Sequence, residues 1–268
     1  MKKISFCSLK VCYPRRVGSI PTGSGRPNGG FGKGGQTMLT DKLIPDIDRR
    51  LTTWLTIQEK LKKDPPLKQR PTITLSREFG AEAYPLAEIL QDLLQRKTGE
   101  TWTIFDKALI ERVSKESSLS EHFLTNLGDA SKAFDALLTM LPNMRTHGDA
   151  YQIMARHIIR IALDGNAIII GRGGAVLTQH LPHCYHFRLE APFEFRVKSI
   201  QRRLGISEKE AKALVQENQK VRERFIENLL NTSIADIRYY HAVFNNAKSE
   251  ARVIAQSILA LMFGEESA

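Results

Sequence analysis

Three short polar segments of the sequence carry residues that could bind phosphate, and each follows an apolar run. They are Ser76-Arg77-Glu78-Phe79-Gly80, Asp106-Lys107 and Gly171-Arg172-Gly173-Gly174. A glycine turn that enters a helix presents backbone N–H groups and the positive end of the helix dipole to an anion, and arginine binds phosphate oxygens in pairs. Each segment alone also fits an ordinary turn or a surface ion pair, so the prediction of a phosphate site depends on their combination.

A further group of cations lies in the last third of the chain. Lys220, Arg222 and Arg224 fall on one predicted long helix, which begins with a capping-box pattern from Ser207 to Glu210. Phosphoryl transfer needs several cations, because its catalysis rests on positioning and on stabilising oxygen charge. Lys220 and Arg224 are one helical turn apart and can face the same site, although such charge runs are also typical of a solvated helix face.

The elements that would position these residues alternate between strand and helix. The predicted strands are Thr72–Leu75, Trp102–Phe105, Ala167–Ile170, Tyr185–Leu189 and Ala242–Phe244. Short apolar strands that alternate with helices predict an α/β fold in three layers, with a parallel sheet covered on both faces. Ligands of such sheets bind at the carboxyl ends of the strands, which is where the three polar segments lie.

Amphipathic spacing predicts the helices. One begins at Pro85 and carries an apolar stripe from Leu86 to Leu94; the others are Asp41–Leu61, Phe123–Leu141, Asp149–Leu163, Phe193–Leu204 and Ser249–Phe263. We therefore expect three parts: a leader over residues 1–37, an N-terminal helix with a charged, proline-rich linker over 38–70, and the α/β domain over 71–264.

The leader differs in composition from the rest of the chain. It holds seven basic residues, no acidic residue and eight of the 18 glycines, so it cannot bury enough apolar surface to fold and is predicted to be disordered. The stretch Gly18-Ser19-Ile20-Pro21 is also what one frame of the TΨC arm of a transfer-RNA gene would encode, which makes Met38 an alternative start. Without the leader, the formal charge falls from +10 to +3.

The composition of the remaining chain gives little support for a nucleic-acid or membrane partner. A charge of +3 is weak evidence for a nucleic-acid partner, and no segment has the about 18 consecutive apolar residues of a membrane span, so we expect a cytoplasmic protein. The three cysteines show no disulfide or zinc-finger spacing, and His180, His183 and His186 are not expected to share a face, so no metal site is predicted. The oligomeric state stays open.

Five blocks, taken in order, resemble the cytidylate kinase-like family of P-loop nucleoside-monophosphate kinases. They are Ile73 to Gly80, Phe105 to Ile110, Ile170 to Gly174, Arg188 to Pro192 with Arg196, and Gly205 to Ser207 continuing through Lys220 to Phe225. The resemblance spans Pro71 to Phe263. It implies a P-loop kinase fold with a helical lid, and an enzyme that uses ATP and Mg²⁺ to phosphorylate a pyrimidine nucleoside monophosphate, CMP or dCMP.

The resemblance also assigns roles to individual residues. The ATP phosphates would be bound by Ser76, Arg77, Gly80, Ala81 and Ala83. The acceptor monophosphate would be bound by Asp106, Arg172 and Gly173. The catalytic cations would be Arg77, Lys220, Arg222 and Arg224, with Arg77 replacing a lysine that the phosphate loop lacks.

The chain departs from the phosphate-loop pattern in ways that affect activity. That pattern ends in Gly-Lys-Ser/Thr, whereas this chain has Ala83-Tyr84-Pro85, and Gln219 stands where the lid of the family tends to carry an aspartate. Glu82 would repel a triphosphate, since two like charges ~4 Å apart interact by about 4 kcal/mol at an effective dielectric of 20. The alternative prediction is therefore a degenerate kinase fold that binds a nucleotide or a protein without catalysis, and the direction of Glu82 discriminates the two.

Overall fold

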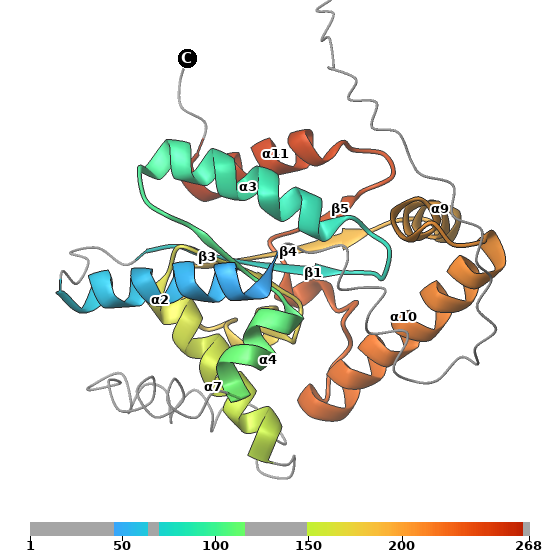
Figure 1. Ribbon diagram of the computed structural model, residues 1–268. Coiled ribbons are helices and arrows are strands. Elements are labelled where there is room, and N and C mark those ends of the chain that lie inside the picture. Colours follow the sequence, from blue (N-terminus) through green and yellow to red (C-terminus); the bar gives the residue numbers. More distant parts are fainter. Residues whose placement is uncertain (1–45, 64–69, 116–148, 265–268) are drawn as a thin grey trace, which may run out of the picture.

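The computed structural model describes residues 46–63, 70–115 and 149–264. In these residues, five parallel strands form one sheet in the order β2-β3-β1-β4-β5 (Figure 1). The strands are β1 (Thr72–Arg77), β2 (Thr103–Phe105), β3 (Ala167–Ile170), β4 (Cys184–Glu190) and β5 (Ala242–Asn245). Each predicted strand is present, and its ends differ from the prediction by two residues at most.

Alternating side chains give the sheet two apolar faces. In β3, Ile168 and Ile170 join the core beneath α3 (Ala83–Thr98) and α11 (Ala251–Phe263), whereas Ile169 joins the core on the opposite face. Successive residues of a strand point to opposite faces, and the register places Ile168 beside Ile73 of β1. The predicted three-layer α/β fold with a parallel sheet is therefore confirmed.

The second face of the sheet is covered by α4 (Lys107–Lys115), α7 (Asp149–Asp164) and the short helix α8 (Gly174–Leu177). Helices α9 (Phe193–Leu204) and α10 (Glu208–Leu230) pack together to one side of these layers (Figure 1). They share a smaller apolar core with Phe79, which follows β1. A short 3-10 helix, η1 (Ile237–Tyr239), leads into β5.

The N-terminal helix α2 (Ile47–Lys63) also packs on the second face. Leu51 and Trp54 are buried, and the Trp54 ring meets the Phe105 ring edge-on with centroids 5.8 Å apart. In Figure 1 its first turn points toward the centre of the molecule, near the start of α4. The helix is thus anchored at the end of β2, close to the strand ends.

Local signals in the sequence fix several helix ends. The capping box at Ser207 is present, with the side chains of Ser207 and Glu210 each accepting from the backbone N–H of the other. One start was predicted wrongly: α3 begins at Ala83, so Pro85 is its third residue. Proline is accommodated there because the N–H groups of a first helical turn lack partners within the helix in any case.

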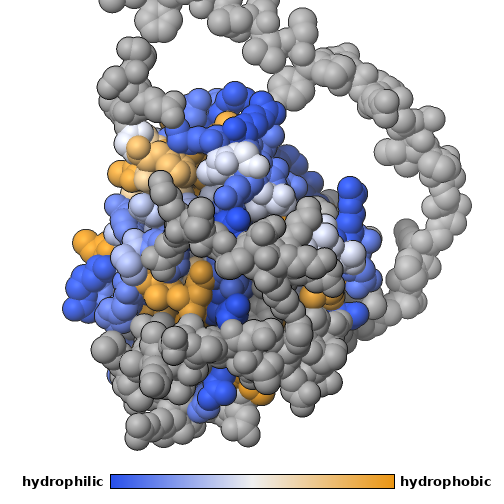
Figure 2. Space-filling model, turned by 90° about the vertical axis from the view of Figure 1, so that its left-hand side faces the viewer, coloured by the Kyte–Doolittle hydropathy of each residue, from blue (hydrophilic) through white to orange (hydrophobic). Residues whose placement is uncertain are grey.

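Some predicted segments lie outside the described residues. These are the leader over 1–37, the start of the helix predicted from Asp41, and the helix predicted over 123–141. None of the described helices is long and apolar enough to cross a membrane. Figure 2 shows one face of the molecule, where the coloured residues are mainly hydrophilic and the apolar ones form small separate groups.

Candidate active site

A cavity of about 560 Å³ lies at the carboxyl ends of β1, β2 and β3, between these loops and helices α9 and α10. Its size is within the usual range for small-molecule sites. All three predicted polar segments contribute to its wall. Of the predicted site residues, the lining includes Ser76, Arg77, Gly80, Ala81, Ala83, Asp106, Arg172, Gly173 and Arg222.

Cationic side chains dominate the wall of this cavity. Six of the described lining residues are basic and two are acidic; the basic ones are Arg77, Lys107, Arg112, Arg172, Arg203 and Arg222, and the acidic ones are Asp106 and Glu111. Low-dielectric walls lined by one sign of charge concentrate ligands of the opposite sign. The charge of this wall therefore favours an anionic ligand over a cationic one.

Three arginines form the centre of this positive region. Burial, and then the charge of Arg172, lower the pKa of Arg77 to about 10. Burial, and then the charges of Arg77 and Arg172, lower the pKa of Arg222 well below its usual range. Among the described residues, no carboxylate lies within 4 Å of the guanidinium of Arg77 or Arg222. These two cations therefore lack the neutralising partner that a buried charge normally has.

Aromatic rings and backbone oxygens hold the arginines in place. The Arg222 guanidinium lies 4.8 Å from the Phe79 ring centroid and donates to the backbone oxygen of Arg77 at 3.5 Å. That of Arg172 lies 4.7 Å from the Phe225 ring centroid and 3.6 Å from Glu111. Cation–π contacts of this kind orient a guanidinium without neutralising it.

The turn after β3 has the backbone conformation that lets Arg77 enter the cavity. Gly171 has φ of +78°, and a Cβ atom there would lie 1.8 Å from Nη1 of Arg77. The space at this glycine is thus filled by the side chain of Arg77. Arg172 itself has φ of +54°, an uncommon conformation for a residue with a side chain and one found often at functional sites.

The loop after β1 already uses several of its N–H groups. The N–H of Phe79 donates to Oε1 of Gln219, and that of Glu82 donates to Oδ1 of Asn246, both at 2.8 Å. The N–H of Ala83 donates to the backbone oxygen of Ala81 at 2.8 Å. Phosphate oxygens would have to displace the two carboxamides to bind these amides.

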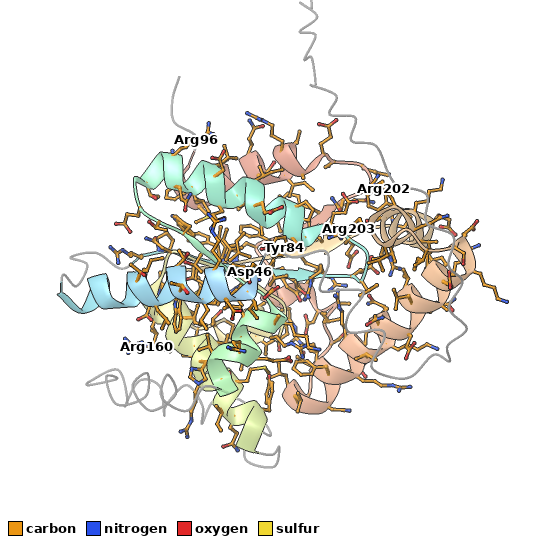
Figure 3. All side chains as sticks on the ribbon, in the orientation of Figure 1. Asp46, Tyr84, Arg96, Arg160, Arg202 and Arg203 are labelled. Carbon is orange, nitrogen blue, oxygen red and sulfur yellow. The ribbon has the colours of Figure 1, made fainter. Side chains whose placement is uncertain are left out.

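Glu82 is turned away from the cavity. Its Oε1 accepts from Oγ of Ser199 at 2.8 Å and from Nη2 of Arg202 at 2.6 Å, and Glu82 is not among the residues that line the cavity. Figure 3 shows Arg202 and Arg203 on α9. Two donors on α9 thus hold the carboxylate, and the repulsion expected from the sequence is relieved.

Asp106 is more constrained than the sequence suggests. Its Oδ1 accepts from the N–H of Leu109 at 3.0 Å, which helps to cap α4. Arg50 of α2 donates to both carboxylate oxygens, at 3.0 and 3.3 Å. A carboxylate has about four acceptor positions, so one position is left for a ligand.

Helix α10 presents only some of its cations to the cavity. Asn218, Val221, Arg222 and Phe225 line it, at the spacing of one helical face. Lys220 and Arg224 are exposed and are absent from the lining. Arg222 is thus brought together with Arg77 and Arg172, and the other two predicted cations are not.

The described residues do not form a magnesium site of their own. No group of three or more His, Cys, Asp or Glu side chains among them is arranged to hold a metal ion. Asp106 is paired with Arg50, and Glu111 lies 3.6 Å from Arg172 and 4.0 Å from Lys107. Since Mg²⁺ commonly binds one or two carboxylates together with substrate phosphates, these residues do not fit a metal held by the protein alone.

The fold and the cavity define an α/β protein with a cation-lined cavity at the carboxyl ends of its parallel strands. A family model described as the cytidylate kinase-like family matches residues 72–248, about two thirds of the chain. The chain belongs to the cytidylate kinase-like family. This membership supports a nucleotide kinase-like function, and the comparison with curated proteins found no match.

A solved structure with a TM-score above 0.5 agrees with the fold. A crystal structure of an uncharacterized protein from Eubacterium ventriosum matches with a TM-score of 0.58 and 17% identity, over 74% of this chain and 100% of that one. A shikimate kinase from Bacteroides thetaiotaomicron gives a TM-score of 0.37 and 12% identity, over 71% and 95% of the two chains. At such identities, the first likeness concerns the fold alone, and the second carries no argument.

Proposed function

We propose that the protein is a nucleoside-monophosphate kinase that transfers the γ-phosphoryl group of ATP to CMP or dCMP. The observation that carries this proposal is the group of three mutually repelling arginines, Arg77, Arg172 and Arg222, around one cavity. Burying such charges together is unfavourable unless an anion neutralises them. The choice of a pyrimidine acceptor follows from the resemblance to the family.

In the proposed reaction, an oxygen of the acceptor phosphate attacks the γ-phosphorus of ATP in line. The bond from that phosphorus to the bridging oxygen breaks, ADP leaves, and no covalent enzyme intermediate forms. Mg²⁺, when bound to the ATP phosphates, would offset part of their charge. The protein would supply the remaining cations and the positioning.

The roles follow from the positions of the side chains. Arg77, with Ser76 and the backbone of Gly80, Ala81 and Ala83, would bind ATP phosphates. Arg172, Gly173 and Asp106 would bind the acceptor. Arg222 donates to the backbone oxygen of Arg77, and the charge of Arg172 helps to lower the pKa of Arg222. Arg222 therefore lies near both phosphate-binding arginines and would stabilise the transferred group. Lys220 and Arg224 would contribute as lid cations only if α10 moves.

A second candidate is a binding module without catalysis. Two features of the phosphate loop favour it. The side chains of Gln219 and Asn246 already accept hydrogen bonds from backbone N–H groups of the loop. The loop also has Ala83-Tyr84-Pro85 where the usual lysine and hydroxyl residue would stand. The outward direction of Glu82 and the cation-rich cavity favour the enzyme instead.

The first test combines ligand binding with turnover. Thermal unfolding is measured with Mg-ATP, CMP, dCMP, UMP and AMP added separately, since a ligand of the native state raises the melting temperature. Release of ADP is then measured with each acceptor. ADP release with CMP or dCMP supports the kinase. A shift in melting temperature with ATP but no ADP release with any acceptor supports a module that binds nucleotides. No shift with any ligand at millimolar concentration contradicts the kinase and nucleotide binding, and supports a module that binds a protein instead.

Three variants assign the roles. Arg172→Ala should raise KM for the acceptor, whereas Arg222→Ala should lower kcat more than it changes KM. Loss of one charge-assisted hydrogen bond is worth about 1.5–3 kcal/mol, or roughly 10- to 150-fold. Lys209→Ala removes an exposed charge from α10 as a matched control and should leave both constants unchanged. Unchanged kinetics in both Arg172→Ala and Arg222→Ala would remove the assignment.

A further inference from the structure

A residue outside the family-matched segment contacts a side chain that lines the cavity. Arg50 belongs to α2, whereas the family model begins at residue 72. Its Nη1 and Nη2 donate to the two oxygens of Asp106, and Nη2 also donates to the backbone oxygen of Ile104 at 2.8 Å. The side chains of Arg50 and Asp106 are 12% and 6% exposed, so water screens this pair weakly.

The same arginine lies near a second residue that lines the cavity. Its guanidinium carbon lies 5.7 Å from the centroid of the Tyr84 ring, in the first turn of α3, and Ile47 of the same helix lines the cavity. Figure 3 shows Asp46, which precedes α2, and Tyr84 near the centre of the molecule. Because Leu51 and Trp54 are buried in the core, α2 holds Arg50 firmly between Tyr84 and Asp106.

Neutralising Asp106 changes what the cavity can accept. An unpaired carboxylate at this wall would attract a hydroxyl but repel a phosphate. Paired with Arg50, Asp106 keeps about one acceptor position and adds no net charge, and the cations Arg77, Arg172 and Arg222 then act on an anionic ligand without opposition from it.

We propose that helix α2 is part of the acceptor side of the cavity, and that Arg50 is a positioning residue that makes the site selective for a phosphomonoester over its uncharged nucleoside. This inference rests on the proposed function for its choice of acceptor. Arg50 acts through Asp106, fixing the carboxylate and cancelling its charge. The family-matched segment by itself lacks this contribution.

The expected effect follows from one uncompensated charge. At an effective dielectric of about 20, an uncompensated unit charge changes affinity about tenfold per unit of ligand charge even across a separation of about 12 Å, and by more across a shorter one. An uncharged nucleoside has no net charge for the Asp106 carboxylate to repel. Loss of Arg50 should therefore weaken binding of CMP much more than binding of cytidine.

The experiment uses the full chain and measures Kd by calorimetry, well below the melting temperature of each variant. The ligands are CMP, cytidine and inorganic pyrophosphate. Arg50→Ala should raise the Kd of CMP and of pyrophosphate at least tenfold, and the Kd of cytidine less than threefold. Arg50→Lys, which keeps the charge but not the paired geometry, should fall between Arg50→Ala and the wild type. Arg49→Ala removes an exposed charge from the same helix and should have no effect.

A charge-neutral double variant separates positioning from folding. Arg50→Ala combined with Asp106→Asn removes the uncompensated charge and keeps an acceptor for the N–H of Leu109, so affinity for pyrophosphate should return to within threefold of the wild type. An equal rise in the Kd of CMP and of cytidine in Arg50→Ala would show a merely structural role and overturn the proposal. So would a double variant whose affinity for pyrophosphate does not recover.

Pyrophosphate also distinguishes the failure of this inference from failure of the proposed function. If the wild type binds pyrophosphate but no nucleotide, the kinase proposal fails, while a tenfold loss in Arg50→Ala still supports Arg50 as the residue that neutralises Asp106. If pyrophosphate binds the wild type and Arg50→Ala equally, or binds neither, the inference is overturned.

Discussion

Replacing Arg77 with methionine should stabilise the unliganded protein while abolishing its response to anions. Arg77 lies in the cavity without a carboxylate partner among the described residues, and its guanidinium rests against Gly171. Methionine keeps a flexible stem of similar length without the charge. Most substitutions of this kind destabilise a protein, so a gain in stability would be a specific consequence of the buried charge.

The magnitude follows from the pKa of Arg77, which burial and the charge of Arg172 lower to about 10. A pKa that is lower in the folded state means that the charged form is disfavoured there. The cost is fully present below about pH 10 and fades as the pH rises above it. At 1.36 kcal/mol per pH unit it is about 3 kcal/mol at pH 7, which corresponds to a rise of roughly 5–10 °C in melting temperature, less whatever packing is lost.

The assay is thermal and urea unfolding at pH 7, with and without pyrophosphate at about 5–10 mM. A ligand that binds the native state raises its stability by mass action, so a millimolar concentration reveals even weak binding. Arg196→Met is the matched control, because Arg196 is buried but has Glu78 at 3.5 Å and donates to the backbone oxygen of Ala191 at 2.9 Å. That control should be destabilised. The reasoning is refuted if Arg77→Met is less stable than the wild type, or if pyrophosphate still stabilises it.

Two further predictions concern Glu82 and His186. Glu82→Gln should leave ATP affinity within about twofold, because the carboxylate is held by Ser199 and Arg202 outside the cavity; a tenfold gain in affinity by calorimetry would show that it faces the phosphates. Burial, and then the charge of His241, lower the pKa of His186 to about 4, so its contribution to stability is present above about pH 6.5 and is lost as the pH falls toward 4. His186→Gln, which can still bond Thr74 (2.8 Å in the wild type), should reduce the acid slope of the unfolding free energy by up to about 1.4 kcal/mol per pH unit, and an unchanged slope would contradict this.

Local patterns were sufficient for most of the fold. The β-branched run at Thr72 and the apolar run at Ala167 became central strands, because a strand buried on both faces requires apolar residues at successive positions. Ser207 and Glu210 fixed the start of α10 because a capping box satisfies orphan N–H groups by contacts three residues apart. The start of α3 was misplaced by two residues, since proline is tolerated at more than one position of a first turn.

The sequence also predicted that its polar loop residues would gather at one place, because the carboxyl ends of parallel strands meet at one edge of the sheet. Arg77, Asp106 and Arg172 each follow a strand and all line the same cavity. Their positions along the chain carried this information once the strands and the parallel sheet had been predicted. The resemblance to the cytidylate kinase-like family added the expected ligands.

Tertiary structure decided the features that depend on contacts between distant segments. The charge pattern of α10 was visible, but its docking determined that Arg222 enters the cavity while Lys220 and Arg224 stay exposed. Glu82 turned outward because α9, about 120 residues later, supplies its donors. Arg50 stands 56 residues before Asp106, and helical periodicity marks the apolar face of α2 without identifying the charge that it carries to the site. Sequence periodicity encodes which face of an element is buried, whereas the partner of a charged side chain is set only when the elements pack.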